Sequence, residues 1–215
     1  MPPVVSFVGK GKTGKTTFLE KLIPELVRRG YRVATIKHTV HPTTLDQPEK
    51  DTARHLKAGS SVIAISSPNE IALIKRALPG MGLDDLVRQI GEDYDILLTE
   101  GFKQGNAPKI EVHRWEKGEA LGESLTGLIA IITDEPLNVK VKQFSLEDIK
   151  GVADLLETDF IKPNHERLVL YVNGKSVPLS AFPRDIISNT IMGAVSSLKG
   201  VNEVKSIDIS LRRKT

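Results

Sequence analysis

The sequence of 215 residues contains no cysteine, and only 5% of its residues are aromatic. Without thiols the protein has neither disulfide bonds nor thiolate metal ligands, so oxygen or imidazole groups would have to hold any metal. The longest apolar run, residues 128–132, is too short to span a bilayer, and no basic segment with a cleavage site opens the chain. We therefore expect a cytoplasmic protein without a membrane partner.

A large excess of charge of one sign is also missing. The formal net charge is +3 and the isoelectric point is near 9.0, which is compatible with anionic ligands. Because no stripe of basic residues interleaved with aromatic residues is present, we expect no nucleic-acid partner. The length and the hydrophobic content of 40% suit one α/β domain with a small appendage.

Short apolar runs alternate with helical patterns over most of the chain. A β-branched run at 4–8 leads into glycines, a helical pattern covers 15–29, and a second strand-like run follows at 32–37. This order predicts a βαβ unit with parallel strands and a right-handed crossover. Further strands are predicted at 62–66, 71–75, 96–99, 110–113 and 128–133, and further helices at 51–58, 83–90 and 146–156. Such alternation is typical of a three-layer α/β fold with a mostly parallel sheet.

The character of the sequence changes after this region. We place a nucleotide-binding domain at 1–161 and a small domain of unassigned role at 165–215. Asn173-Gly174 lies between two alternating runs and predicts a hairpin. A helix beginning at Pro183 and a last strand at 204–211 complete a predicted α+β appendage of ββαβ order.

The loop after the first predicted strand matches the phosphate-binding pattern Gly, four residues, Gly-Lys-Thr. It consists of Gly9, Lys10, Gly11, Lys12, Thr13, Gly14, Lys15, Thr16 and Thr17. Glycines allow consecutive backbone N–H groups to surround phosphates, and the following helix adds unpaired donors and a positive dipole end. We expect Lys15 to contact the β- and γ-phosphates of a nucleoside triphosphate as a catalytic residue, and the Thr16 hydroxyl to bind Mg²⁺. This predicts a P-loop NTPase fold.

Glu100 is the predicted second partner of the metal and a catalytic candidate. It ends the predicted strand at 96–99, and ligands of open α/β sheets bind at the carboxyl ends of strands. Asp95 lies about 16 Å away at the start of this strand, since each strand residue spans about 3.3 Å. Glu100 would either act on Mg²⁺ through a water molecule or orient an attacking water molecule, and the sequence leaves these roles open. The alternative interpretation is a glutamate before glycine that simply ends the strand.

Lys10 occupies the position where the P-loops of the MinD and ParA proteins carry a signature lysine, although Lys12 replaces a glycine of that pattern. Such a lysine would reach a phosphate across a dimer interface. The alternative interpretation is a solvated lysine on a basic loop.

Several further segments, together with the phosphate loop, resemble the MobB family, the adaptors of molybdopterin-guanine dinucleotide biosynthesis. The resemblance covers roughly residues 4–157. It rests on Ile36-Lys37-His38, Asp51, Arg54-His55, Ala58-Gly59, Glu100-Gly101-Phe102-Lys103, Pro108-Lys109-Ile110-Glu111-Val112, Arg114 and Ile132-Thr133-Asp134. It implies a homodimeric protein that binds GTP with Mg²⁺ and hydrolyses it slowly. It also implies two partners, a molybdopterin guanylyltransferase and a molybdopterin-type ligand.

Four residues form a candidate surface for a substrate, a partner or a metal. His38 closes the second strand, at the sheet edge that carries the phosphate loop. Asp51 and His55 are four residues apart and share a helix face, so with His38 and His41 they would approximate a metal site. The alternative is structural, with Asp51 as a helix N-cap and a nearby histidine as its hydrogen-bond donor.

Lys103, Lys109 and Arg114 follow Glu100 in the sequence. As the resemblance suggests, they could present cations to a second phosphate-bearing ligand on the pterin or partner side. Asp134 follows the strand at 128–133, where its carboxylate could accept both N1–H and N2–H of guanine, and this favours GTP. Because Asp134 also opens a good turn sequence, turn formation is the alternative interpretation.

The sequence thus favours a GTP-dependent accessory protein of molybdenum cofactor maturation with at most weak GTPase activity. The alternative is a P-loop kinase that phosphorylates a small metabolite. Such an enzyme would need an arginine-bearing lid, whereas residues 101–107 contain only Lys103 as a cation. A metal-insertion GTPase is a third interpretation, against which the absence of cysteine and the scattered histidines argue.

Overall fold

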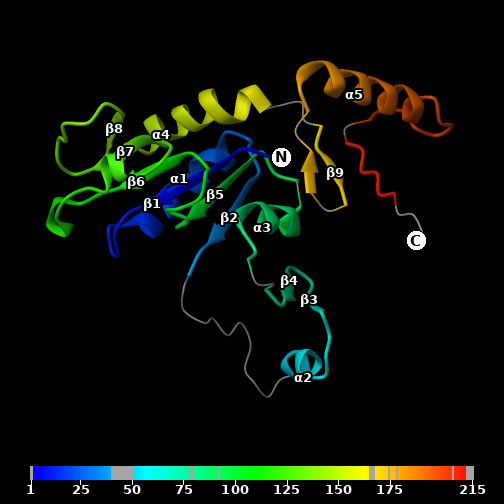
Figure 1. Cartoon of the computed structure of the whole chain (residues 1–215), viewed down its shortest axis with the longest axis horizontal. Helices are drawn as coiled ribbons and strands as arrows, with labels where there is room; N and C mark the ends of the chain where they lie inside the picture. Colours follow the sequence, from blue (N-terminus) through cyan, green and yellow to red (C-terminus); the bar gives the residue numbers. More distant parts are fainter. Residues whose placement is uncertain are drawn as a thin grey trace. The chain divides into compact units, whose positions relative to one another are not determined.

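The computed structural model describes residues 2–39, 51–77, 80–91, 93–164, 168–173, 175–177, 179–204 and 206–211. The chain divides into two compact units, Pro2–His165 and Glu166–Thr215. The first unit contains a six-stranded sheet with helices, and the second contains a hairpin and a helix (Figure 1).

All six strands of the main sheet are parallel. They are β1 (Val4–Val8), β2 (Val33–Lys37), β5 (Ile96–Glu100), β6 (Lys109–Val112), β7 (Leu128–Thr133) and β8 (Lys142–Ser145). Their order is β2-β5-β1-β6-β7-β8, so β5 separates the two strands of the first βαβ unit. The first five strands confirm the predicted ones to within one or two residues. The sequence did not predict β8, because this short edge strand is polar and mostly exposed.

Helices cover both faces of the sheet, which confirms the predicted three-layer fold. Helices α1 (Lys15–Arg28), α3 (Leu83–Ile90) and α4 (Ile149–Leu156) lie against the sheet (Figure 1). Alternate strand residues such as Val5 and Leu98 pack against α1 and α4, while Leu97 packs on the other face against α3. Leu22 and Leu26 of α1 are fully buried, and each such side chain stabilises the fold by about 1.5–3 kcal/mol. The short helices η3 (Glu157–Ile161) and η4 (Lys162–Asn164) continue α4.

One face of β6 is polar although it is buried. Lys109 and Glu111 alternate with apolar residues along β6 and are at most 1% exposed, as is His113 directly after it. The Glu111 carboxylate accepts hydrogen bonds from the backbone N–H groups of Leu121 (2.7 Å) and Gly122 (2.8 Å). Irregular chain with the short helices η1 (Trp115–Lys117) and η2 (Gly122–Ser124) is thereby held to the strand.

The predicted strands β3 (Val62–Ser66) and β4 (Ile71–Lys75) form at the expected residues, but they do not join the main sheet. They pair with each other in antiparallel orientation, after the short helix α2 (Asp51–Lys57). The connection at 67–70 is too short for a parallel crossover, and it closes with a hydrogen bond from Ser67 N–H to the Glu70 carbonyl oxygen (2.8 Å). The predicted, mostly parallel sheet is thus confirmed, but these two strands lie outside it.

The C-terminal unit contains a hairpin followed by a helix. Strands β9 (Leu170–Val172) and β10 (Lys175–Val177) pair in antiparallel orientation, and Asn173 between them has φ 50°. Helix α5 (Ala181–Ser196) follows. The strand predicted at 204–211 is absent from the described residues 201–204 and 206–211, so their alternating pattern was misleading. Across the described parts of both units, no helix combines the length and apolar character needed to cross a bilayer.

Arg29, directly after α1, joins this helix to the end of α4. Its guanidinium donates to Glu25 (2.9 Å), Asp154 (2.7 Å) and Glu157 (2.7 Å), and the side chain is only 16% exposed. Hydrogen bonds from Lys162 and Arg29 lower the pKa of Glu157 to about 2. Because the folded-state pKa of this carboxyl group is depressed, its stabilising effect is present at neutral pH and is lost as the pH falls toward 2.

We expect Arg29→Ala to lower the melting temperature at pH 7 by about 3–6 °C, because three carboxylates lose their shared donor. The matched control is Arg28→Ala, which removes an exposed guanidinium whose one ion-pair partner among the described residues is Glu25, and it should have a smaller effect. Circular dichroism melts from pH 7 to pH 2 measure both variants. The difference between wild type and Arg29→Ala should shrink below about pH 4 as Glu157 becomes protonated, and an equal difference at all pH values would contradict the assignment.

Candidate nucleotide-binding site

The loop between β1 and α1 packs closely against the end of β6. Gly9 has φ 148°, and a Cβ atom at this position would lie 2.3 Å from the carbonyl oxygen of Val112, so only glycine fits. Gly14 is the N-cap of α1, and no side chain caps this helix. Within the described residues, no carboxylate accepts a hydrogen bond from the N–H groups of residues 10–14. These donors, with those of the first turn of α1, therefore suit an anion.

Lys12 holds an unusual backbone conformation at the crest of this loop. Its φ is 61°, in the left-handed region that costs a residue with a Cβ atom about 1–2 kcal/mol. This is the position where Lys12 replaces a glycine of the deviant P-loop pattern. Lys12 thus adopts the backbone conformation that a glycine at this position would adopt without strain.

The other two lysines of the loop donate to main-chain carbonyl groups. The Lys10 ammonium lies 3.1 Å from the carbonyl oxygen of Lys117, so it is bonded within its own chain. The Lys15 ammonium lies 2.7 Å from the Lys10 carbonyl oxygen and 3.4 Å from that of Gly9. Burial lowers the pKa of Lys15, and the Glu100 carboxylate partly opposes this shift.

Thr16 and Glu100 meet at the carboxyl edge of the sheet. The Thr16 hydroxyl oxygen is 3.0 Å and 2.9 Å from the two carboxylate oxygens of Glu100, although 84 residues separate them. Glu100 ends β5, next to Phe7 of β1, so the strand order brings it beside the phosphate loop. Hydroxyl and carboxylate oxygens are the donors that Mg²⁺ prefers, so these two residues fit the metal.

Lys37 also contacts Glu100, although the sequence does not mark it as a site residue. It is the last residue of β2 and lies directly opposite Glu100 in the register of the two strands. Its ammonium is 3.7 Å from Glu100 Oε2. A lysine at the end of a strand has no sequence pattern that marks it as a site residue. Only the pairing of β2 with β5 shows that Lys37 lies beside Glu100.

The candidate partner surface is only partly assembled. His38 lies beside the site, because its N–H donates to the Glu100 carbonyl oxygen (2.9 Å) and its ring is 4.5 Å from that of Phe102. Asp51 and His55 lie in α2, which begins at Asp51 itself. Among the described residues, no three His, Asp or Glu side chains gather as a metal site, and His41 lies outside these residues.

The three predicted cations have different surroundings. Lys103 is exposed on the loop after β5. Lys109 is fully buried, and its ammonium donates to the carbonyl oxygens of Gly105, Ala107 (3.2 Å) and Thr126 (2.6 Å). Burial lowers the pKa of Lys109. The prediction that Lys109 presents a cation to a ligand is therefore wrong, because this side chain holds the main chain of its own loop.

Arg114 and Asp134 support the phosphate loop from the side. The Arg114 guanidinium donates to the Thr13 carbonyl oxygen (3.2 Å) and lies 3.6 Å from Asp134 Oδ2. Asp134 Oδ1 accepts the backbone N–H of Trp115 (3.0 Å). Asp134 follows β7 at the same sheet edge as the phosphate loop, and its carboxylate keeps further acceptor capacity.

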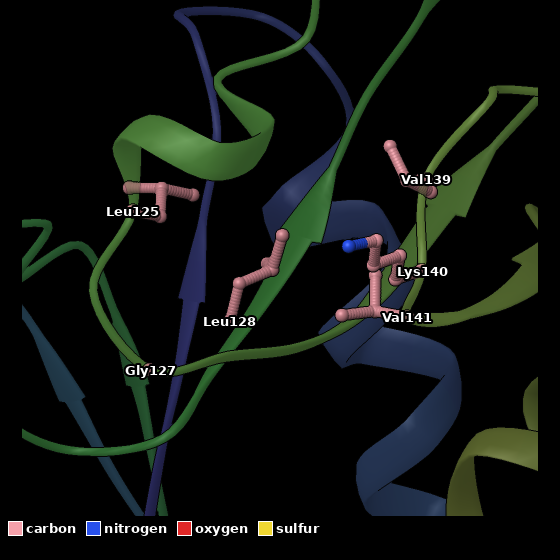
Figure 2. Close-up of a pocket in the computed structure, with 6 residues that line it drawn as sticks. All are labelled: Leu125, Gly127, Leu128, Val139, Lys140 and Val141. Atoms are coloured by element: carbon pink, nitrogen blue, oxygen red, sulfur yellow. The ribbon is translucent and has the colours of Figure 1, made fainter.

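A surface pocket of about 270 Å³ lies at the opposite edge of the sheet, where β7 and β8 begin (Figure 2). Its lining consists of Leu125, Gly127, Leu128, Val139, Lys140 and Val141. The full length of the parallel strands separates this edge from the phosphate loop, and the pocket contains none of the candidate residues.

Comparison with known proteins identifies the family. The family model described as "Molybdopterin guanine dinucleotide synthesis protein B", or MobB, matches residues 4–134, which is more than half of the chain. The chain belongs to the MobB family. The matched MobB segment includes the phosphate loop, Glu100 and Asp134, and the C-terminal unit lies outside it.

Related MobB proteins agree with this assignment. The molybdopterin-guanine dinucleotide biosynthesis adapter protein of Haemophilus influenzae is 36% identical over 156 residues, which are 72% of this chain and 88% of the relative. A putative adapter protein of Methanocaldococcus jannaschii is 23% identical and covers 97% of both chains, so that alignment extends into the C-terminal unit. The crystal structure of a MobB homolog from Bacillus stearothermophilus is 27% identical, with a TM-score of 0.55 over 75% of this chain and 99% of that one. The resemblance seen in the sequence is thus confirmed.

We expect Lys12→Gly to raise the free energy of unfolding by about 0.5–1 kcal/mol, because glycine adopts the left-handed conformation without a steric penalty and loses part of this gain to chain entropy. Urea denaturation measures the change. The matched control is Lys12→Ala, which keeps the Cβ atom and should bring no gain. A loss of stability in Lys12→Gly would contradict the left-handed conformation of this residue.

Proposed function

We propose that this protein binds Mg²⁺ and GTP at its phosphate loop and acts as an adaptor in molybdopterin-guanine dinucleotide biosynthesis. Its membership of the MobB family and the adapter role stated for the H. influenzae relative support the pathway. We further propose a homodimer that assists a molybdopterin guanylyltransferase, with His38 and Lys103 on the side of the partner or of the molybdopterin-type ligand. The phosphate loop is the feature that supports the proposal of nucleotide binding.

The single observation that carries the proposal is the contact between Thr16 and Glu100. It joins the start of α1 to the end of β5, next to backbone N–H groups that no carboxylate of the described residues occupies. A phosphate bound by these N–H groups would have two oxygen ligands for a metal beside it. A glycine turn with a merely structural role would not require this juxtaposition.

The residues of the site have two roles, which are to bind the phosphates and to hold the metal. Lys15 would exchange its carbonyl partners for the β- and γ-phosphates, while Thr16 and Glu100 would hold Mg²⁺. When bound, magnesium supplies positive charge that offsets the phosphate charge. Lys10 donates to the Lys117 carbonyl oxygen and Arg114 to the Thr13 carbonyl oxygen, so both side chains connect the phosphate loop to the segment after β6.

The choice of guanine is assigned to Asp134, whose carboxylate could accept two N–H groups of the base. We expect Asp134→Asn to reduce the preference for GTP over ATP by about tenfold, since an amide cannot accept both groups. Competition binding with the two nucleotides measures this ratio. An equal loss of affinity for GTP and ATP would contradict guanine recognition and leave Asp134 as a support for Arg114.

The proposal is tested by nucleotide binding together with capture of the partner. The wild type should bind GTP in calorimetry, hydrolyse it slowly and retain a molybdopterin guanylyltransferase in a pull-down. Lys15→Ala should weaken GTP binding by about 100-fold or more while its circular dichroism spectrum stays unchanged, because the ammonium group contacts two phosphates. Equal GTP affinity in both proteins would refute the site, and rapid phosphorylation of a small metabolite would refute the adaptor role.

A further inference from the structure

We propose that Lys37 is a built-in counter-cation for Glu100, which Mg²⁺ displaces and which then binds the terminal phosphate of the nucleotide. This inference rests on the proposed function and adds to it a residue on β2. At the Glu100 carboxylate, the positive charge of Mg²⁺ would thus replace that of the Lys37 ammonium.

The position of Lys37 is fixed by the sheet. Lys37 and Glu100 end neighbouring parallel strands and are directly paired in register. The N–H of the next residue, His38, donates to the Glu100 carbonyl oxygen at 2.9 Å, which extends the pairing beyond the strands. The two side chains therefore leave the sheet at the same edge, and the lysine ammonium reaches Glu100 Oε2 at 3.7 Å.

The charges around the carboxylate explain why a cation is needed there. The Glu100 side chain is only 17% exposed, and its neutral partner Thr16 has one hydroxyl proton to donate to two oxygens. A mostly buried carboxylate that shares a single hydroxyl proton among the described residues is costly to leave without a positive charge. Lys37 supplies this charge in the metal-free protein.

The contact is also weak enough to be exchanged. The Lys37 side chain is 65% exposed, the ion pair is at the long end of the range, and exposed ion pairs contribute little to stability. A divalent cation bound to Glu100 and Thr16 would attract the carboxylate more strongly and repel the ammonium group. The flexible four-carbon stem of lysine allows the ammonium to move without any change in the main chain.

After it leaves Glu100, the Lys37 ammonium would lie close to the bound phosphates, at the same edge of the sheet. The phosphates bound by the loop would lie beside Lys15, and its neighbour Thr16 contacts the same carboxylate as Lys37. Burial is the main cause that lowers the pKa of Lys15, and the nearby charges of Lys103 and Lys37 add to this shift. Lys15, Lys37 and Lys103 outnumber the carboxylate of Glu100 in this region, and such an excess of positive charge favours a polyanionic ligand. Lys37 would then contribute to affinity for the triphosphate only after it leaves Glu100.

The test measures two affinities of the full-length protein with Lys37→Met. Calorimetry with Mn²⁺ alone, without nucleotide, should show about twofold to fivefold tighter binding of the metal, because its competitor is gone. Calorimetry with GTP and Mg²⁺ should show about fivefold to tenfold weaker binding, because a phosphate contact is lost. Lys37→Arg, which keeps the charge, should stay close to the wild type in both measurements.

Lys103→Met is the matched control, since it removes one exposed ammonium from the same region without an ion pair to Glu100 among the described contacts. Its Mn²⁺ affinity should rise less than that of Lys37→Met. If Lys37→Met leaves both affinities unchanged or weakens both, the exchange is refuted, while GTP binding by the wild type still supports the proposed function. If the wild type itself binds no GTP, the proposed function and this inference both fail.

Discussion

The close packing of the phosphate loop against the end of β6 is the constraint on which the rest of the site depends. At Gly9 the main chain passes so near the Val112 carbonyl oxygen that a Cβ atom would lie only 2.3 Å from it. The buried hydroxyl of Thr13 then closes the loop on the Lys10 carbonyl oxygen at 3.2 Å. With its sides fixed in this way, the loop presents its N–H groups at the start of α1 without any side-chain cap.

The order of the strands brings the other residues of the site together. Because β5 is inserted between β1 and β2, the ends of three strands that are distant in sequence lie next to one another. This places Thr16, Lys37 and Glu100 within one set of contacts, although each comes from a different element. The same edge carries Asp134 at the end of β7, so the fold itself gathers the charged groups at one side of the sheet.

Local pattern was sufficient for much of this arrangement. The glycine-rich loop, the first βαβ unit and the position of Glu100 at a strand end follow from spacing and periodicity, because each signal lies within a short stretch of chain. The place of Lys37 required the pairing of β2 with β5, which no local pattern encodes. Lys109 was misjudged because a buried lysine is rare, and only the structure shows the three carbonyl groups that accept its hydrogen bonds.

Errors in the strands have a similar origin. The runs at β3 and β4 have the composition of strands, yet their short connection makes them a separate antiparallel ribbon. At 204–211, alternation alone predicted a strand, but a strand also needs a partner with which to pair, and the described residues there form none. The C-terminal unit thus remains a hairpin and a helix whose role the MobB match at 4–134 does not address.

The most direct test of the account is a crystal structure of the protein with Mg²⁺ and a non-hydrolysable GTP analogue. The β-phosphate should lie within the N–H groups of the loop at 9–16, with the metal held by the Thr16 hydroxyl on the Glu100 side. An analogue bound elsewhere, such as in the pocket where β7 and β8 begin, with the loop empty, would contradict it.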